Sequence, residues 1–159
     1  MTDEAGLHDF DFLYGRWAVR ARRLKHRLAD SDEWIEFTAE LSTWPLLDGY
    51  ANVDDYRTDY GLVGTAMRLF DPKTGSWSIF WVAKSNPVMD THPVVGRFEG
   101  GTGVFEADDV FNEQPIRVRF VWSGVNTPEP HWEQAFSADG GITWETNWVM
   151  DYTRVGNAP

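Results

Sequence analysis

Hydrophobic and polar residues alternate along most of this chain, in short runs separated by polar turns or turns that contain glycine or proline. Successive side chains of an extended strand point to opposite faces, so this alternation predicts strands with one buried face. A first strand is expected to begin at Gly15 and end before the polar turn 28–33. The others are expected at 34–44, 50–58, 62–70, 77–84, 94–99, 103–111 and 116–123, with two more strands of a final hairpin within 131–154.

These strands are about ten in number and follow one another through short turns, which is typical of an antiparallel meander. A meander of this length closes into a barrel because closure removes the two unpaired edges. Residues 3–13, capped by Thr2 or Asp3, are expected to form one or two short helical turns. Residues 85–93 contain two prolines and little pattern, so they are expected to form a loop. The sequence therefore predicts an all-β fold, a single closed up-and-down barrel spanning 1–159 as one domain.

Counting by twos along each strand predicts which side chains face the interior. One such set is Val63, Thr65, Met67 and Leu69. The acidic pair Asp54 and Asp55 is expected to be solvated. The remaining inward sets are Trp77, Ile79, Trp81 and Ala83; Ile116, Val118, Phe120 and Trp122; and Trp132, Gln134 and Phe136.

The final hairpin has a turn of the form Ser-x-Asp-Gly-Gly-x-Thr-Trp, from Ser137 to Trp144. This string resembles the Asp-box of sialidase propellers, in which the Asp and Thr tie the turn together and the Trp packs beneath it. Propellers repeat the box in every blade and this chain has one good copy, so Asp139 and Trp144 are interpreted as structural. One face of the last strand is expected to look inward, and it comprises Trp144, Thr146, Trp148, Met150, Tyr152 and Arg154.

The first strand opens with Gly15-Arg16-Trp17. Gly-x-Trp at this place is similar to the signature of the lipocalins and other calycins. That resemblance implies that Trp17 plugs the closed end of the barrel and that an arginine late in the last strand packs across it. Arg154 stands in the corresponding position, so Gly15, Trp17 and Arg154 are expected to form a structural unit.

Composition and charge narrow the classes of function. The chain has 159 residues and no cysteine, which excludes disulfides and thiolate chemistry. Its net charge of −11 argues against nucleic acid and anionic membranes as partners. No apolar run is long enough to span a bilayer, and the acidic N-terminus lacks the apolar core of a signal peptide. A cytoplasmic protein is expected, acting alone or as a homodimer.

The expected interior is aromatic with scattered polar groups, which is typical of a pocket for a mostly apolar compound that carries an acidic or carbonyl group. Arg23 has the parity of Trp17 and is the candidate partner for a ligand carboxylate; the alternative is a solvated strand edge. Gln134 either meets the ligand or bonds a backbone group in a packed core. The ligand-binding candidates are Arg23, Trp81, Trp122, Gln134, Trp148 and Met150.

Two other functions stay open. Related barrels act as cofactor-independent cyclases or isomerases, and here His92, His131 or Tyr56 could transfer the proton. A haem barrel would need an inward histidine on a late strand, for which His131 is the nearest residue. The four histidines do not have the spacing of metal ligands, so neither a metal site nor any cofactor is expected.

Over nearly its full length the chain resembles a bacterial family of unknown function with a lipocalin-like barrel. That resemblance implies a fold and carries over no catalytic residue. It rests on four motifs, Phe-Leu-Tyr-Gly-Arg-Trp at 12–17, Leu-Phe-Asp-Pro-Lys-Thr-Gly-Ser-Trp-Ser-Ile-Phe-Trp at 69–81, Pro-Ile-Arg-Val-Arg-Phe-Val-Trp at 115–122 and Trp-Glu-Gln-Ala-Phe-Ser-Ala-Asp-Gly-Gly at 132–141.

Overall fold

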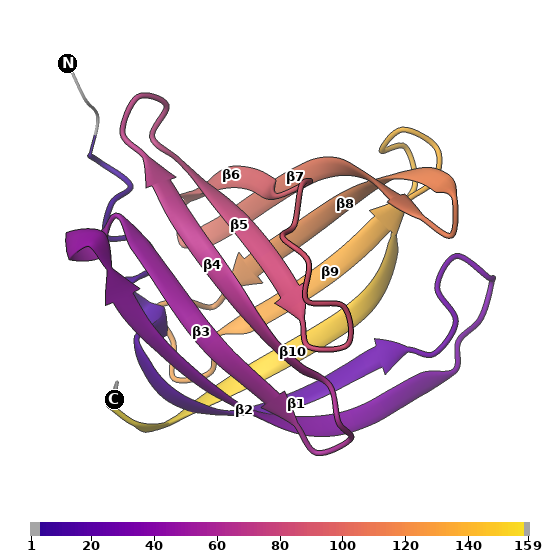
Figure 1. Cartoon of the computed structure of the whole chain (residues 1–159), viewed down its shortest axis with the longest axis horizontal. Coiled ribbons are helices and arrows are strands. Elements are labelled where there is room, and N and C mark those ends of the chain that lie inside the picture. The colour runs from indigo at the N-terminus through magenta and orange to yellow at the C-terminus, as the bar shows by residue number, and fades with distance from the viewer. Residues whose placement is uncertain (1–3, 158–159) are drawn as a thin grey trace.

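The computed structural model describes residues 4–157, which form a closed antiparallel barrel in which each strand pairs with its neighbours in sequence (Figure 1). The predicted fold, a single up-and-down barrel of about ten strands, is confirmed. The strands are β1 (Gly15–Leu24), β2 (Trp34–Leu46), β3 (Ala51–Thr58), β4 (Val63–Asp71), β5 (Ser76–Ala83), β6 (Val94–Glu99), β7 (Thr102–Phe111), β8 (Gln114–Ser123), β9 (His131–Ser137) and β10 (Glu145–Gly156).

The barrel closes through β1, which pairs with β2 on one side and with β10 on the other. Trp17 is opposite Leu41 in the first ladder and opposite Arg154 in the second. Residues 4–13 lie at the end of the barrel where β1 begins, whereas the β1–β2, β7–β8 and β9–β10 connections lie at the other end (Figure 1). We call these the closed end and the mouth.

The N-terminal segment plugs the closed end. Its only helical element among the described residues is a short 3-10 turn, η1 (Asp11–Leu13), so the helical turns expected over 3–13 form only in part; Thr2 and Asp3 lie outside the described residues. Phe10 is fully buried, and its ring packs edge-on against Trp77 and Phe98 with ring centroids 5.1 and 5.0 Å away. The plug therefore adds aromatic side chains to the core at the closed end of the barrel.

The Gly-x-Trp unit at the closed end has the predicted geometry. The Arg154 guanidinium lies 4.2 Å from the centre of the Trp17 ring. It donates to the carbonyl oxygen of Tyr14 and, at 2.7 Å, to that of Phe12. The Trp17 indole nitrogen donates to the carbonyl oxygen of Leu13 at 2.8 Å. The first strand, the last strand and the plug are thus joined by one set of contacts.

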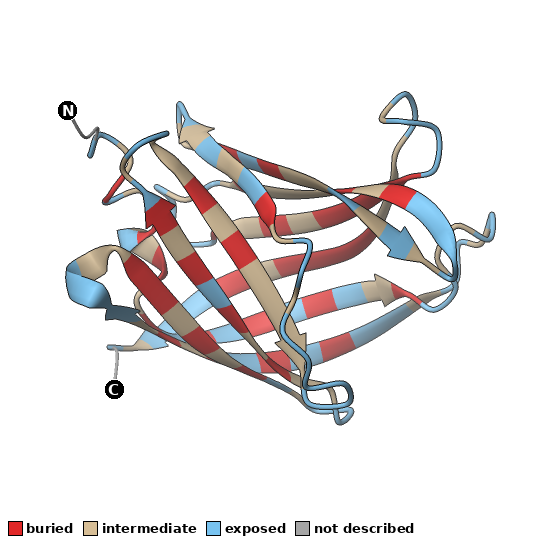
Figure 2. Cartoon of the chain, turned by 45° about the horizontal axis from the view of Figure 1, so that its top comes forward, coloured by how far each residue is buried: buried red, intermediate tan, exposed pale blue. Residues whose placement is uncertain are grey.

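Buried residues alternate with more exposed ones along the strands (Figure 2). In β4 the prediction of the inward face is wrong, because Gly64, Ala66, Arg68 and Phe70 are the buried residues. The physical reason is that the Trp81 ring of the neighbouring strand needs the space on the inward face of β4. A Cβ on Gly64 would lie 2.3 Å from the Trp81 indole of β5, so a small residue has to face inward there.

The expected inward face of β10 is correct for Trp148, Met150 and Tyr152 but wrong for Trp144. The β9–β10 register shifts between Thr146 and Trp148, which inserts Asn147 as an extra residue. Such a bulge reverses the inward and outward parity beyond it. The Trp144 ring is therefore stacked against Arg119, 4.1 Å from its guanidinium, instead of joining the Trp148 cluster.

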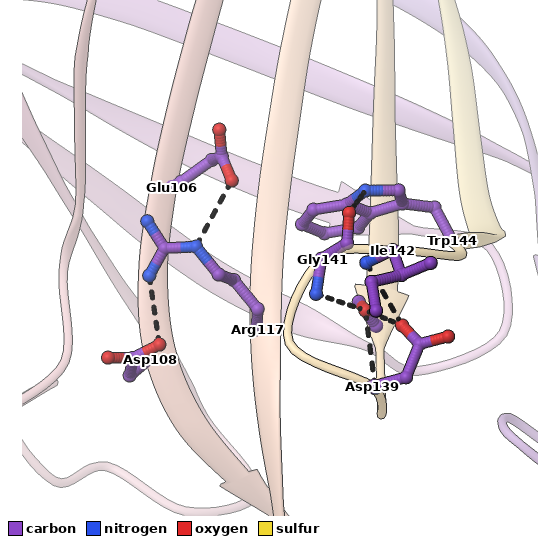
Figure 3. Close-up of polar contacts among 8 residues, drawn as sticks. Glu106, Asp108, Arg117, Asp139, Gly141, Ile142 and Trp144 are labelled. Atoms are coloured by element: carbon purple, nitrogen blue, oxygen red, sulfur yellow. Dashed lines mark hydrogen bonds and ion pairs between the residues drawn. The ribbon is translucent and has the colours of Figure 1, made fainter.

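The turn between β9 and β10 is held by Asp139, as the Asp-box resemblance implies. The Asp139 carboxylate accepts the backbone N–H groups of Ile142 and Thr143 at 3.1 and 2.9 Å, together with the Thr143 hydroxyl. Hydrogen bonds from Thr143 hold the pKa of Asp139 well below its usual range, at about 2. Trp144 donates its indole N–H to the Gly141 carbonyl, so the ring caps the turn (Figure 3).

Candidate functional site

The barrel interior contains a cavity of about 60 Å³, which we call the inner cavity. Its walls come from β2–β5 and β8–β10 and are mostly aromatic. It is lined by Leu41, Asp54, Tyr56, Ala66, Arg68, Ile79, Trp81, Phe120, Trp122, Trp132, Gln134, Trp148, Met150 and Tyr152. All the predicted ligand-binding residues except Arg23 are in this set; their role in binding stays a prediction.

A larger cavity of about 430 Å³ occupies the mouth. Its rim includes Arg23, Arg27 and residues of the loop 84–93, among them the exposed Val88 and Met89. Five residues line both cavities, namely Ile79, Trp81, Phe120, Gln134 and Trp148. Along the barrel axis, the interior therefore runs from the mouth arginines to the residues that line only the inner cavity. Between them lies a layer of these five shared residues, three of them aromatic, which we call the aromatic layer.

Arg23 and Arg27 both lie over aromatic rings at the mouth. The Arg23 guanidinium is 4.4 Å from the centre of the Trp148 ring, and that of Arg27 is 4.8 Å from the centre of Phe111. Within residues 4–157, neither forms an ion pair with a carboxylate, and the Nε of Arg23 is buried without a hydrogen-bond partner. Burial lowers the pKa of Arg27, and repulsion from Arg23 lowers it further.

The inner cavity also contains a buried ion pair that sequence reasoning missed. Asp54 and Arg68 are 4% and 5% exposed, and their side chains meet at 2.8 Å. Asp54 also accepts the Ala66 backbone N–H at 2.8 Å, and Arg68 donates to Asn52 at 2.9 Å. Burial raises the pKa of Asp54 and the positive charge of Arg68 opposes that rise.

The expectation that Asp54 is solvated is therefore wrong, whereas its neighbour Asp55 does point outward and pairs with Arg57 at 2.7 Å. One signal in the sequence could have revealed this. Asn52, Asp54 and Tyr56 follow each other at intervals of two, so a strand that turns Tyr56 inward also turns Asp54 inward.

Two phenols lie beside the ion pair. The hydroxyls of Tyr56 and Tyr152 both approach the sulfur of Met150, at 3.2 and 3.7 Å. Burial raises the pKa of both phenols, so both remain protonated at neutral pH. On the neighbouring strand β9, Gln134 donates to the Asn147 side chain at 2.8 Å, not to a backbone group as the packed-core alternative supposed.

Of the three groups considered for proton transfer, only Tyr56 lines the inner cavity. His92 lies in the loop 84–93 at the mouth, 3.7 Å from Asp109. His131 belongs to β9 but has the parity opposite to Trp132 and Gln134, which line the interior. Its ring meets Asp151 at 2.7 Å and Glu133 at 2.9 Å, so the histidine that a haem barrel would need is engaged away from the cavity.

The pairing of His131 predicts a pH-dependent contribution to stability. Burial lowers the pKa of His131, but hydrogen bonds and attraction from Asp151 and Glu133 outweigh it, and the net pKa is raised. A raised pKa in the folded state stabilises the fold below the unfolded pKa of about 6.5 and loses that effect as pH rises through the folded value.

We therefore expect His131→Gln to destabilise the protein more at pH 6 than at pH 8.5, by about 0.5–1 kcal/mol for this partly exposed group. Urea unfolding at the two pH values measures the difference. His8→Gln is the control, because the His8–Asp11 pair lies on the surface. An equal effect of His131→Gln at both pH values would contradict the prediction.

Residues 4–157 contain no group of three or more His, Cys, Asp or Glu side chains placed to hold a metal ion. The same residues include no helix long and apolar enough to cross a membrane.

The fold and interior define a class, a closed β-barrel whose aromatic interior opens at one end beside two arginines that pair with no carboxylate of residues 4–157. Comparison with known proteins found no matching family model and no matching curated protein. Among solved structures, the chain is similar to the barrel in "Crystal Structure of Rv2717c from M. tuberculosis", with 13% identity, a TM-score of 0.63, and coverage of 95% of this chain and 98% of that one. At that identity the likeness shows the fold alone.

Proposed function

We propose that this protein binds a small, mostly apolar or aromatic molecule that carries an acidic group, with the apolar part inside the barrel. The observation that supports this most directly is the pair of mouth arginines. Arg23 and Arg27 lie at the entrance of an aromatic interior, and neither is neutralised by a carboxylate of residues 4–157. A ligand carboxylate or sulfonate would supply that missing partner.

The charge of the chain makes this arrangement selective. With a net charge of −11, most of the protein repels anions, so two guanidinium groups that no carboxylate of residues 4–157 neutralises create a local site for anions at one opening. The rings of Trp148 and Phe111 beneath the two guanidinium groups hold the cations in place without neutralising them. An anion can thus bind while its apolar part enters the aromatic layer.

The closed end supports a place for this barrel among the calycins. In that class a tryptophan on the first strand and an arginine late in the last strand close one end, which leaves the other end for the ligand. Trp17 and Arg154 stack at 4.2 Å here, and the cavities lie beyond them toward the mouth. The proposed direction of entry, past Arg23 and Arg27, follows from that closure.

The dye 1-anilinonaphthalene-8-sulfonate tests the proposal, because it is aromatic and carries a sulfonate. We expect saturable binding at one site, and we expect the double variant Arg23→Gln, Arg27→Gln to weaken it at least about tenfold. Loss of one charge-assisted hydrogen bond of about 1.5 kcal/mol is enough for that factor. The readout is a fluorescence titration, repeated at low and high salt because the attraction should be screened.

Arg22→Gln is the matched control. Arg22 is the residue before Arg23 on the same strand, but it lies exposed on the outer face, with its guanidinium 4.5 Å from the centre of the Trp34 ring. This variant should change the dissociation constant less than twofold. Non-saturable dye binding, or equal binding by wild type and the double variant with native near-ultraviolet circular dichroism, would overturn the proposal.

A further inference from the structure

The inner cavity is lined by buried hydrogen-bond donors that have no partner among residues 4–157. Within residues 4–157, two of its lining side chains have a buried N–H without a hydrogen-bond partner, namely the Nε of Arg68 and the indole nitrogen of Trp122. Guanidinium and indole nitrogens can donate but cannot accept. Both side chains are more than nine-tenths buried, so bulk water does not satisfy them.

Two of the acceptors that line the same cavity, Asp54 and Met150, are already occupied. Both carboxylate oxygens of Asp54 accept hydrogen bonds, one from Ala66 and one from Arg68. The sulfur of Met150 receives the hydroxyls of Tyr56 and Tyr152. Unpaired buried donors are costly and uncommon, so a group that accepts hydrogen bonds from Arg68 and Trp122 would be stabilised in this cavity.

The position of these donors along the barrel axis gives their relation to the proposed ligand. Arg68 and Trp122 line only the inner cavity, and Arg23 and Arg27 line only the mouth. The aromatic layer that contains Trp148 lies between them and borders both cavities. A molecule whose acidic group meets the mouth arginines thus presents its opposite end to the inner donors.

We infer that the ligand of this barrel carries a second polar group at its buried end, and that this group is a hydrogen-bond acceptor without a proton to donate, such as a ketone, aldehyde or quinone carbonyl. The inference rests on the proposed function and adds the chemistry of the buried end. The apolar middle of the ligand lies against Trp81, Phe120 and Trp148, and its carbonyl oxygen accepts from Trp122 and Arg68.

Two probes of the same size test it, 3-(4-acetylphenyl)propanoate and 3-(4-ethylphenyl)propanoate. Each has a carboxylate at one end and a ring in the middle, and they differ only in a carbonyl against a methylene at the far end. We expect calorimetric titration of the wild-type protein to show at least about tenfold tighter binding of the acetyl compound. The corresponding butanoates, measured in the same way, scan the distance between the two polar ends.

Trp122→Phe removes one inner donor and keeps an aromatic ring. It should reduce the preference for the acetyl compound to less than about threefold while the ethyl compound keeps its affinity within a similar factor. Trp132→Phe is the matched control, because Trp132 lines the same cavity, is equally buried, and its indole nitrogen is not among the unpaired donors. The control should retain the full preference.

Equal affinity of the wild-type protein for the two members of each pair would overturn the inference, because the inner donors would then be satisfied by water. Full retention of the preference in Trp122→Phe would equally overturn the role of that indole. The wild-type comparison does not depend on the folding of any variant. Binding of the naphthalenesulfonate dye without a carbonyl preference removes the inference alone, whereas failure of the dye and all four probes to bind removes the proposed function with it.

Discussion

Arg68→Met should lower the free energy of unfolding by about 3–5 kcal/mol, the cost of leaving one member of a buried ion pair without its partner. Arg68 holds the Asp54 carboxylate at 2.8 Å in a place that is 4% exposed, so the variant would strand a negative charge inside an aromatic barrel. It would also leave the Asn52 side-chain oxygen without its donor. Urea unfolding followed by far-ultraviolet circular dichroism measures the loss.

A second substitution separates the charge from the packing. Asp54→Asn in the Arg68→Met background removes the stranded charge but keeps an oxygen that can accept the Ala66 N–H. This double variant should recover much of the lost stability, because removing both charges of a buried pair is often close to neutral. Recovery by the second substitution would show that the single variant fails through the unpaired carboxylate.

Arg57→Met is the matched control for the ion pair. Arg57 and Asp55 also pair at 2.7 Å, but on the outer surface, where water and salt screen the charges. An exposed pair contributes little to stability, so this variant should unfold close to wild type. If Arg68→Met were no more destabilising than Arg57→Met, the buried pair would have no special role in stability.

Arg154→Ala should lower the free energy of unfolding by about 2 kcal/mol. The variant removes the stack on Trp17, worth about 0.5–1 kcal/mol at an exposed site, and two charge-assisted hydrogen bonds. Those bonds tie the last strand to the carbonyl groups of Tyr14 and Phe12, so their loss also loosens the N-terminal plug. Hydrogen exchange of the amides near Leu13 should accelerate with the drop in stability.

Arg154→Lys should restore little of that stability, because lysine lacks the planar fork that spans two carbonyl groups and covers a ring. Arg97→Ala is the control. Arg97 is an exposed strand residue whose guanidinium donates a hydrogen bond to the Thr74 carbonyl at 2.9 Å. Arg97→Ala should therefore lower the free energy of unfolding by less than half as much as Arg154→Ala does. Equal melting temperatures for wild type and Arg154→Ala would show that the stack does not stabilise the closed end.

The two networks differ in how far the sequence anticipates them. Gly15-x-Trp17 and a late Arg154 predict a stack across the closed end, and the structure contains it. Asp54 and Arg68 belong to different strands and neither belongs to a motif, so only their meeting across the β3–β4 ladder reveals the pair. A pattern within one strand cannot report a partner on another.

The sequence by itself determined the strands, their meander and the closure of the barrel, because period-two alternation and turn chemistry are local. It also placed most of the predicted ligand-binding residues, since Trp81, Trp122, Gln134, Trp148 and Met150 all line the inner cavity.

Only the tertiary structure decided which face of β4 turns inward and where Trp144 lies. Gly64 faces the interior because the Trp81 ring of the next strand fills that space, and Trp144 leaves the inward face because Asn147 adds a residue to β10. Alternation indicates that the two faces of a strand differ. Which face is buried depends on the side-chain volume and the register of the neighbouring strands. That dependence is the physical reason why the buried Arg68 could not be read from its own strand.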